Sequence, residues 1–206
     1  MAKKKVYCVI DTETVGTGNS LVYDFGISIV KKRELPLVEK RWLIKETMQI
    51  PNIEKLPFGW MAKNPIFAGF PITPFFIVRR EFYQMLEKFE VDSITAYNLT
   101  FDKRVLENTS RWLNNGSKFF PDKISLFCLM NAVSNSIYQQ KQYQNMAIRQ
   151  GWLTPTGKIS KKAEHIFQFV SRNFQYIHTH TALEDVASEV EILQEVFRQK
   201  KKINRW

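Results

Sequence analysis

The stretch VYCVIDTETVGTG (residues 6–18) decides the fold class, because an apolar run passes directly into acidic residues. Residues 5–10 are mostly apolar and predict a buried strand. Side chains two apart on a strand leave from one face, so those of Asp11 and Glu13 are expected about 6–7 Å apart, with Thr12 pointing the other way. Two carboxylates this close are costly unless a cation lies between them. Alone, a D-x-E pattern equally fits acids in a surface turn.

The rest of the chain predicts a mixed α/β fold. Strands are expected at residues 21–31, 38–44, 93–97 and 123–127. Helices are expected at residues 78–89, at 98–114 with Asn98 as N-cap and Gly116 after the end, at 140–150, after a cap at Ser160, and from Ala182 onward. Short links between the first three strands favour an antiparallel meander, within a sheet of about five strands flanked by helices.

Residues 46–76 form the longest stretch without a clear period. This segment is rich in Pro, Gly and aromatic residues, so it predicts a long loop that contains about one helical turn. A loop of this length inside a compact domain tends to carry function.

Length and composition predict one folded domain. The 206 residues suit a single core at about residues 5–198, followed by a basic tail at 199–206. The hydrophobic fraction of 44% and the aromatic fraction of 14% are typical of a folded, soluble protein. No apolar run is long enough for a bilayer and the N-terminus does not resemble a signal peptide. Cys8 and Cys128 predict reduced thiols buried in strands, and together these features indicate a cytoplasmic protein.

The charge points to a polyanionic partner. The net charge is +10 and the isoelectric point is near 9.6, which fits nucleic acid but equally fits a solvated surface. Basic residues cluster at 3–5, 31–33, 158–162 and 200–202.

A second acidic feature is YNLTFDKRVL (residues 97–106). If Asn98 caps a helix, Asp102 lies in its first turn, directly after a strand. This position is the carboxyl edge of the sheet, where α/β proteins gather their sites. Phe101 and Val105 are expected to face the core. Alone, Asp102 equally fits an acid that complements the helix dipole.

The third feature is HTHTALEDVASEVEIL (residues 178–193). Thr181 and Glu184 have capping-box spacing, which predicts a helix start at Ala182. His180 then lies just outside the helix, where its imidazole can reach Asp185.

Two other residues of this stretch receive lesser roles. His178 is interpreted as an exposed loop residue. Glu189, one helical turn after Asp185, is assigned to solvent or to a supporting position behind the site.

Together the three features bring four carboxylates and one histidine to one site. Carboxylate oxygens suit Mg²⁺ or Mn²⁺ better than zinc. Two such ions about 3.5–4 Å apart can clamp the attacking and leaving oxygens of a phosphodiester. Neutral His180 can take a proton near pH 7, and the basic chain attracts a substrate that the acids repel.

At this point the sequence resembles the DEDDh (DnaQ-like) 3′–5′ exonucleases of the ribonuclease H-like superfamily. The first motif, D-x-E-T, matches residues 11–14; the second, N-x-x-F-D, matches residues 98–102; the third, His followed by Asp, matches His180 and Asp185. The resemblance covers residues 6–197, and the pattern TGKISKKAEHIF…HTALED is most similar to small stand-alone phage or prophage members.

The resemblance implies a role for each matched residue. Four residues would hold two Mg²⁺ or Mn²⁺ ions: Asp11, Glu13, Asp102 and Asp185. His180 would be the general base. Thr14, with Glu13, would lie beside the terminal nucleotide, and Asn98 and Phe101 would form part of the substrate pocket. Many relatives have His where this chain has Tyr97, which bears on substrate contacts.

Aromatic and basic residues outside the motifs are further candidates for substrate contacts. Base stacking is considered for Trp60, Phe67, Phe70, Phe75 and Phe76, although such residues are more often core. Phosphate contacts are considered for Lys158, Lys161 and Lys162.

The sequence thus predicts a metal-dependent exonuclease that releases 5′-mononucleotides from a 3′ end. Single-stranded DNA is the favoured substrate, and RNA trimming stays open because it would use the same residues. An inactive nucleic-acid-binding module is the alternative of another class, and retained acids argue against it. An autonomous enzyme of a bacterial or phage-infected cell is favoured over a polymerase-associated proofreading subunit.

Overall fold

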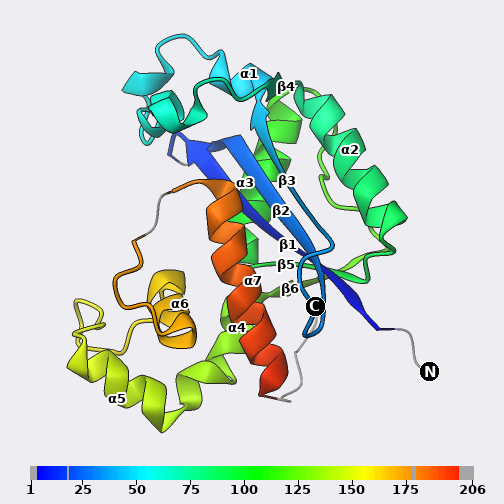
Figure 1. The fold of residues 1–206 in the computed structure, drawn as a ribbon. Coiled ribbons are helices and arrows are strands. Elements are labelled where there is room, and N and C mark those ends of the chain that lie inside the picture. The colour runs from blue at the N-terminus through cyan, green and yellow to red at the C-terminus, as the bar shows by residue number, and fades with distance from the viewer. Residues whose placement is uncertain (1–3, 18, 178–179, 200–206) are drawn as a thin grey trace.

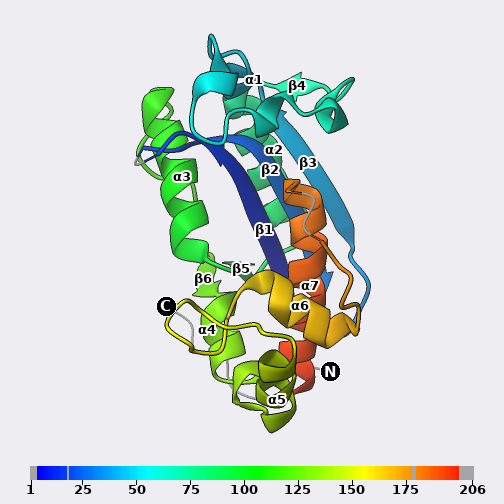
Figure 2. The ribbon, with the colours of Figure 1, turned by 90° about the vertical axis from the view of Figure 1, so that its left-hand side faces the viewer.

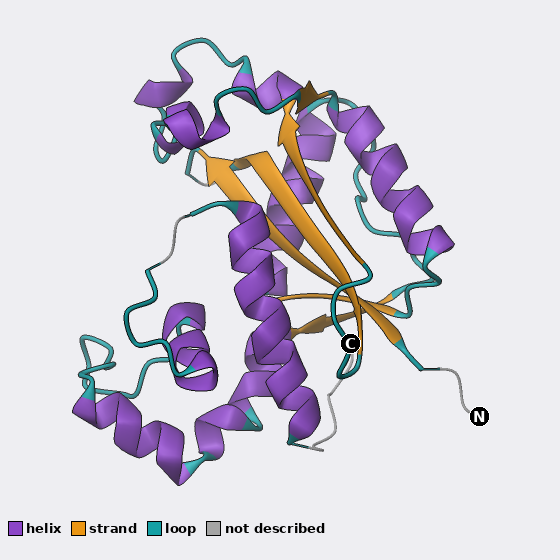
Figure 3. Cartoon of the chain, viewed as in Figure 1, coloured by secondary structure: helices purple, strands orange, loops and turns teal. Residues whose placement is uncertain are grey.

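A computed structural model, which describes residues 4–17, 19–177 and 180–199, shows the predicted mixed α/β fold (Figures 1 and 3). The described residues form a six-stranded sheet in the order β4-β3-β2-β1-β5-β6. The strands are β1 (Val6–Val15), β2 (Leu21–Lys31), β3 (Val38–Ile44), β4 (Ile72–Thr73), β5 (Ser93–Ala96) and β6 (Ser125–Cys128). The antiparallel meander β1-β2-β3 is confirmed. The other pairs are parallel: β4 pairs with β3, β5 pairs with β1, and β6 pairs with β5. The short β4 is the strand that the sequence pattern did not predict.

Helices cover both faces of the sheet (Figures 1 and 2). They are α1 (Lys45–Met48), α2 (Phe75–Lys88), α3 (Leu99–Trp112), α4 (Leu129–Ser134), α5 (Lys141–Arg149), α6 (Ala163–Ser171) and α7 (Ala182–Arg198). Short 3-10 turns lie at η1 (Ile53–Lys55), η2 (Met61–Lys63), η3 (Pro65–Phe67) and η4 (Ile137–Gln139). One apolar core packs α2 and α3 on the sheet, and a second packs α4 to α7 on it.

Strand β1 is longer than the sequence predicted. It runs through the acidic residues to Val15, because β2 pairs with it along its whole length, with a register shift between Glu13 and Thr14. The other neighbour, β5, pairs with β1 only from Tyr7 to Val9. The two parallel strands therefore part just before Asp11, and this opening at the carboxyl ends of strands is where α/β folds place their sites.

Two helix starts differ from the predictions. Helix α2 starts at Phe75 rather than at residue 78, because the carboxylate of Glu46 accepts a hydrogen bond from the Phe75 backbone N–H. Helix α6 starts at Ala163, so Ser160 is not its cap. The Ser160 hydroxyl instead accepts from the Lys162 backbone N–H, at 3.2 Å.

The segment at residues 46–76 is packed, not an open loop. It lies over the ends of β1, β2 and β3 (cyan to teal in Figure 1), where a third apolar cluster contains Val15, Tyr23, Leu43, Ile53, Ala62 and Phe67. The Gly16 N–H donates to the Pro57 carbonyl at 2.8 Å, which ties the segment to the end of β1. Gly59 is required, since a Cβ there would lie 1.7 Å from the Ile53 oxygen.

The aromatic residues of this segment fall into two groups. Phe67 and Phe75 are buried, so stacking on a base is wrong for both. Trp60, Phe70 and Phe76 are 63%, 51% and 57% exposed. Phe58, which the sequence pattern did not single out, is 56% exposed as well, so four aromatic side chains of this segment are open to a ligand.

Two other expectations can be compared with the structure. Cys8 and Cys128 are free, buried and on strands β1 and β6, as predicted. Among the described residues, no helix is both long and apolar enough to span a membrane.

Candidate active site

Three segments that are far apart in the chain bring the predicted carboxylates together. Asp11 and Glu13 lie on β1, Asp102 lies in the first turn of α3, and Asp185 lies in the first turn of α7. A cavity of about 180 Å³ opens between these elements. Its lining residues are Asp11, Thr12, Tyr97, Asn98, Phe101, Asp102, Ala163, Asp185, Ser188 and Glu189.

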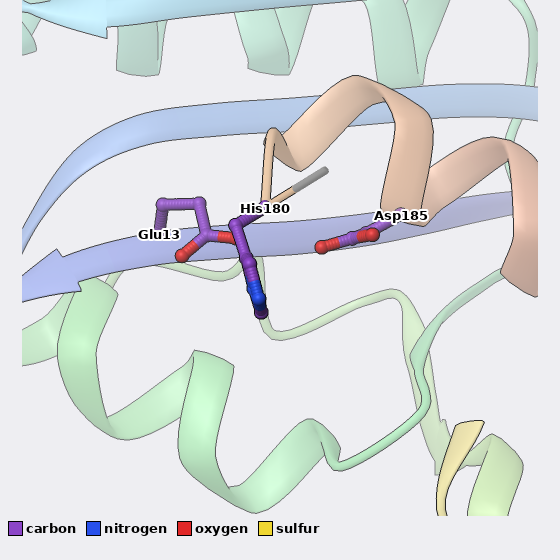
Figure 4. A group of neighbouring side chains, drawn as sticks. All are labelled: Glu13, His180 and Asp185. Atoms are coloured by element: carbon purple, nitrogen blue, oxygen red, sulfur yellow. The ribbon is translucent and has the colours of Figure 1, made fainter. Parts of the chain in front are cut away.

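A second grouping includes the histidine. Glu13, His180 and Asp185 each offer one possible metal-ligating atom, and these atoms all lie within 4.8 Å of one another. Figure 4 shows Glu13 on β1 beside His180 and Asp185 at the start of α7. Asp185 belongs both to this group and to the cavity lining. The structure therefore brings together all five residues predicted for catalysis; His178 lies outside the described residues.

Thr12 connects β1 to α3. Its side chain is buried, and its hydroxyl donates a hydrogen bond of 2.8 Å to Oδ1 of Asp102. This contact agrees with the expectation that Thr12 points away from Asp11 and Glu13. It fixes one oxygen of Asp102.

The start of α7 is held by a contact that no motif predicted. Asp24 on β2 is fully buried, and its Oδ2 accepts from the Ala182 N–H at 3.0 Å. Arg41 on β3 donates to both oxygens of Asp24, at 2.9 and 2.8 Å. At Gly26, a Cβ would lie 2.6 Å from the Ala182 backbone, so glycine lets the helix start approach β2 closely.

The predicted helix start at Ala182 is confirmed, but the capping box is not. The Thr181 hydroxyl donates to Oε2 of Glu184 at 3.0 Å and makes no cap bond to a backbone N–H. His180 precedes this cap with a φ of 56°, an uncommon left-handed conformation for a non-glycine residue. The chain thus turns sharply where the imidazole leaves it.

Glu189 is a fifth carboxylate at the site, and the solvent assignment is wrong. It is 4% exposed, and its Oε2 accepts from the Tyr97 backbone N–H at 2.9 Å. It also lines the cavity. The sequence feature that could have identified Glu189 as part of the site is its position one helical turn after Asp185, on the same face of the helix.

The predicted substrate residues have different positions. Asn98 is exposed at the N-cap position of α3 without a side-chain cap bond, and it lines the cavity. Phe101 is half-buried and also lines the cavity, with the Arg104 guanidinium 5.4 Å from its ring centre. Thr14 is half-buried on β1 and is not among the described residues that line the cavity.

Four carboxyl groups of the site, those of Asp11, Glu13, Asp102 and Glu189, have raised pKa values. Burial, reinforced by the neighbouring Asp185, raises the pKa of Glu13 to about 8, and burial raises the pKa of Asp102 to about 7. The pKa values of Asp11 and Glu189 are also raised well above their ordinary range, first by burial and then by neighbouring carboxylates. Such a set of hard oxygen atoms fits Mg²⁺ or Mn²⁺, whose charge would offset this repulsion.

These pKa values predict that stability without metal falls as the pH rises. Glu13 and Asp102 ionise near 4.5 and 3.8 when unperturbed, but near 8 and 7 when folded. Between these limits the folded state binds more protons than the unfolded state, so the free energy of unfolding decreases with pH. In EDTA we expect the melting temperature to be several degrees lower at pH 8 than at pH 5, by about 2–4 °C per kcal/mol lost.

Addition of Mg²⁺ or Mn²⁺ at pH 8 should restore most of this loss, because the cation binds the ionised carboxylates of the folded state. The measurement is thermal unfolding at both pH values with and without each metal. An equal loss with and without metal would contradict the assignment of a cation to these residues.

The fold is that of known nucleases. The chain matches a 3′-exonuclease that recognises the histone mRNA stem-loop, with a TM-score of 0.67 and 12% identity over 99% of this chain and 87% of that chain. It matches cell-death related nuclease 4 (CRN-4) with a TM-score of 0.64 and 14% identity, over 98% of this chain and 67% of that one.

A third match is Exonuclease I of E. coli in complex with a dT13 oligonucleotide, with a TM-score of 0.62 and 15% identity. It covers 96% of this chain, which spans 42% of that enzyme. No protein-family model and no curated protein sequence matches the chain. At these identities the likeness shows the fold, which is the ribonuclease H-like fold of 3′-exonucleases.

Proposed function

We propose that this protein is a metal-dependent 3′–5′ exonuclease that releases 5′-mononucleotides, with single-stranded DNA as the favoured substrate. One observation carries the proposal: four carboxylates from β1, α3 and α7 converge with His180, which precedes α7, in a fold shared with nucleases. Each carboxylate is costly in isolation, and together they suit the binding of divalent cations.

The proposed roles follow from position. Asp11, Glu13, Asp102 and Asp185 would hold two Mg²⁺ or Mn²⁺ ions. Bound there, the cations supply positive charge against the phosphodiester and its transition state. Thr12 orients Asp102 through its hydroxyl.

His180 is the proposed general base. It is exposed at the end of a loop, while the carboxylates of Glu13 and Asp185 lie on the buried side. From that position its imidazole can accept the proton of an attacking water.

The terminal nucleotide would occupy the cavity beside the carboxylates. Asn98 offers an exposed amide for hydrogen bonds, and the half-buried ring of Phe101 offers a face for the base. Thr14 is proposed to lie beside the same nucleotide, on β1 just after Glu13.

RNA is the alternative substrate, supported by the match to an exonuclease that recognises histone mRNA, whereas the match to Exonuclease I with an oligonucleotide of dT supports DNA. An inactive binding module is a weaker alternative because it would gain nothing from buried, mutually repelling acids. We further propose a cytoplasmic, autonomous enzyme of a bacterial or phage-infected cell, because the pattern TGKISKKAEHIF…HTALED resembles that of small stand-alone phage or prophage members.

The test is a gel assay with 5′-labelled single-stranded DNA and RNA of one sequence. We expect a ladder that shortens from the 3′ end with Mg²⁺ or Mn²⁺, and that disappears in EDTA and in Asp11→Asn. The faster ladder identifies the substrate. Binding without shortening under either metal would reject the enzyme and leave the binding module.

A further inference from the structure

The basic segment KISKK (residues 158–162), here called the lysine segment, is anchored in an unusual way. It lies between α5 and α6 (yellow to orange in Figure 1). Three successive carbonyls of this segment each accept a hydrogen bond from a different tyrosine hydroxyl. The pairs are Tyr138 to Ile159 at 3.4 Å, Tyr143 to Ser160 at 2.7 Å and Tyr97 to Lys161 at 2.5 Å.

Other contacts add to this anchoring. The Ser160 N–H donates to the Trp152 carbonyl at 2.9 Å, and the Ser160 side chain is buried. Tyr97 and Tyr143 are buried as well. A basic run that only aids solubility needs no such support, since its side chains gain nothing from a fixed backbone.

The anchored backbone presents free cations. Lys158, Lys161 and Lys162 are all exposed, and within the described part of the chain none of them forms an ion pair with an acidic side chain. The Lys161 ammonium lies 4.4 Å from the ring centre of Tyr138, which limits the directions that its stem can take.

The lysine segment adjoins the carboxylate cavity. Ala163, the next residue after Lys162, lines that cavity. Tyr97 connects the two directly, because its N–H donates to Glu189 and its hydroxyl donates to the Lys161 carbonyl. Lys161 and Lys162 therefore lie one or two residues from the lining of a cavity whose carboxylates repel phosphate.

We propose that the lysine segment binds the phosphodiester backbone of the strand whose 3′ end enters the cavity. The proposal rests on the proposed function and adds the residues that attract the substrate. An ammonium group on a flexible stem contacts phosphate as a point charge and reads no base. Binding through this segment is therefore electrostatic and independent of sequence.

The test measures how binding depends on salt. A labelled dT oligonucleotide is titrated in EDTA, so that no cleavage occurs, over a range of KCl concentrations, with fluorescence anisotropy as readout. Each phosphate contact to a single strand contributes about −0.7 to the slope of log K against log salt. We expect the triple variant Lys158→Ser, Lys161→Ser, Lys162→Ser to make this slope less steep by about 2.

The matched control removes three other exposed lysines: Lys32, Lys88 and Lys123. They lie near the opposite end of the sheet, where β2 ends beside Val6 and where β5 and β6 begin. The charge change is identical, but these lysines lie away from the cavity, so we expect a slope equal to that of the unchanged protein. An unchanged slope in the first variant, or an equal change in both, would overturn the proposal.

A third variant tests the anchoring. Tyr143→Phe removes the hydroxyl that donates to Ser160 without changing charge or touching the cavity lining. We expect affinity to fall by about 2- to 10-fold, with circular dichroism unchanged; unchanged affinity would overturn the positioning role. Tight binding without cleavage in the gel assay would reject the exonuclease activity but not phosphate binding by the lysine segment. Cleavage by the unchanged protein, together with an unchanged slope in the triple lysine variant, would reject phosphate binding by the segment but not the exonuclease activity.

Discussion

Replacement of His180 by alanine is expected to lower the rate of 3′-end hydrolysis by about 10²–10⁴-fold, the usual contribution of a positioned general base. Binding of a single-stranded oligonucleotide should change little, because His180 is exposed and is not among the described residues that line the cavity proposed to hold the terminal nucleotide. Rates and affinities measured on the same preparation separate these two effects. The rate of the variant should also rise with pH, as hydroxide takes over the role of the base.

Two other histidines serve as controls for this prediction. His178 is the neighbour in sequence, two residues away, and His165 stacks on Trp152 with a ring separation of 5.1 Å. His178→Ala and His165→Gln should each retain most of the activity. A large loss of activity in His178→Ala together with a small loss in His180→Ala would contradict the assignment of the general base to His180.

Replacement of Asp24 by alanine is expected to cost about 3–5 kcal/mol of stability, the usual cost of breaking a buried ion pair from one side. The change leaves Arg41 without its carboxylate and leaves the Ala182 N–H without its acceptor. For a chain of this size the melting temperature should fall by about 6–20 °C. Activity at low temperature should fall as well, because α7 carries Asp185 and begins two residues after His180.

The comparison is with an exposed pair. Lys118 and Asp122 are 2.8 Å apart, with side chains that are 69% and 78% exposed. Asp122→Ala should leave the melting temperature nearly unchanged, since exposed ion pairs contribute little. If both aspartate variants melted at the same temperature, the buried pair would not be what holds α7 in place.

The sequence predicted those features that depend on neighbours in the chain. The limits of β2 follow from local alternation of apolar and polar residues, and β3 and the start of α7 were also placed correctly from short local stretches. The five candidate catalytic residues were found because each sits in a short motif next to a strand end or a helix start.

Features that depend on distant residues could not be predicted. The contact of Asp24 with Ala182 spans 158 positions, and the contact of Glu189 with Tyr97 spans 92. Composition alone also could not separate Phe75, which is buried, from Phe76, which is 57% exposed. In each case the environment is set by chain packing that no local pattern encodes.

Glu13 on β1 pairs directly with Asp24 on β2, so the register of these two strands determines the relative positions of two carboxylates at the site. Directly opposed residues share one face, so the same alignment that sets Glu13 also sets the carboxylate that holds the start of α7. A slip of one residue would turn Glu13 to the other face and move Asp24 away from Ala182. The spacing between the catalytic side chains thus depends on how β1 and β2 are aligned. Substitutions that loosen the meander far from the cavity are therefore expected to reduce activity before the protein unfolds.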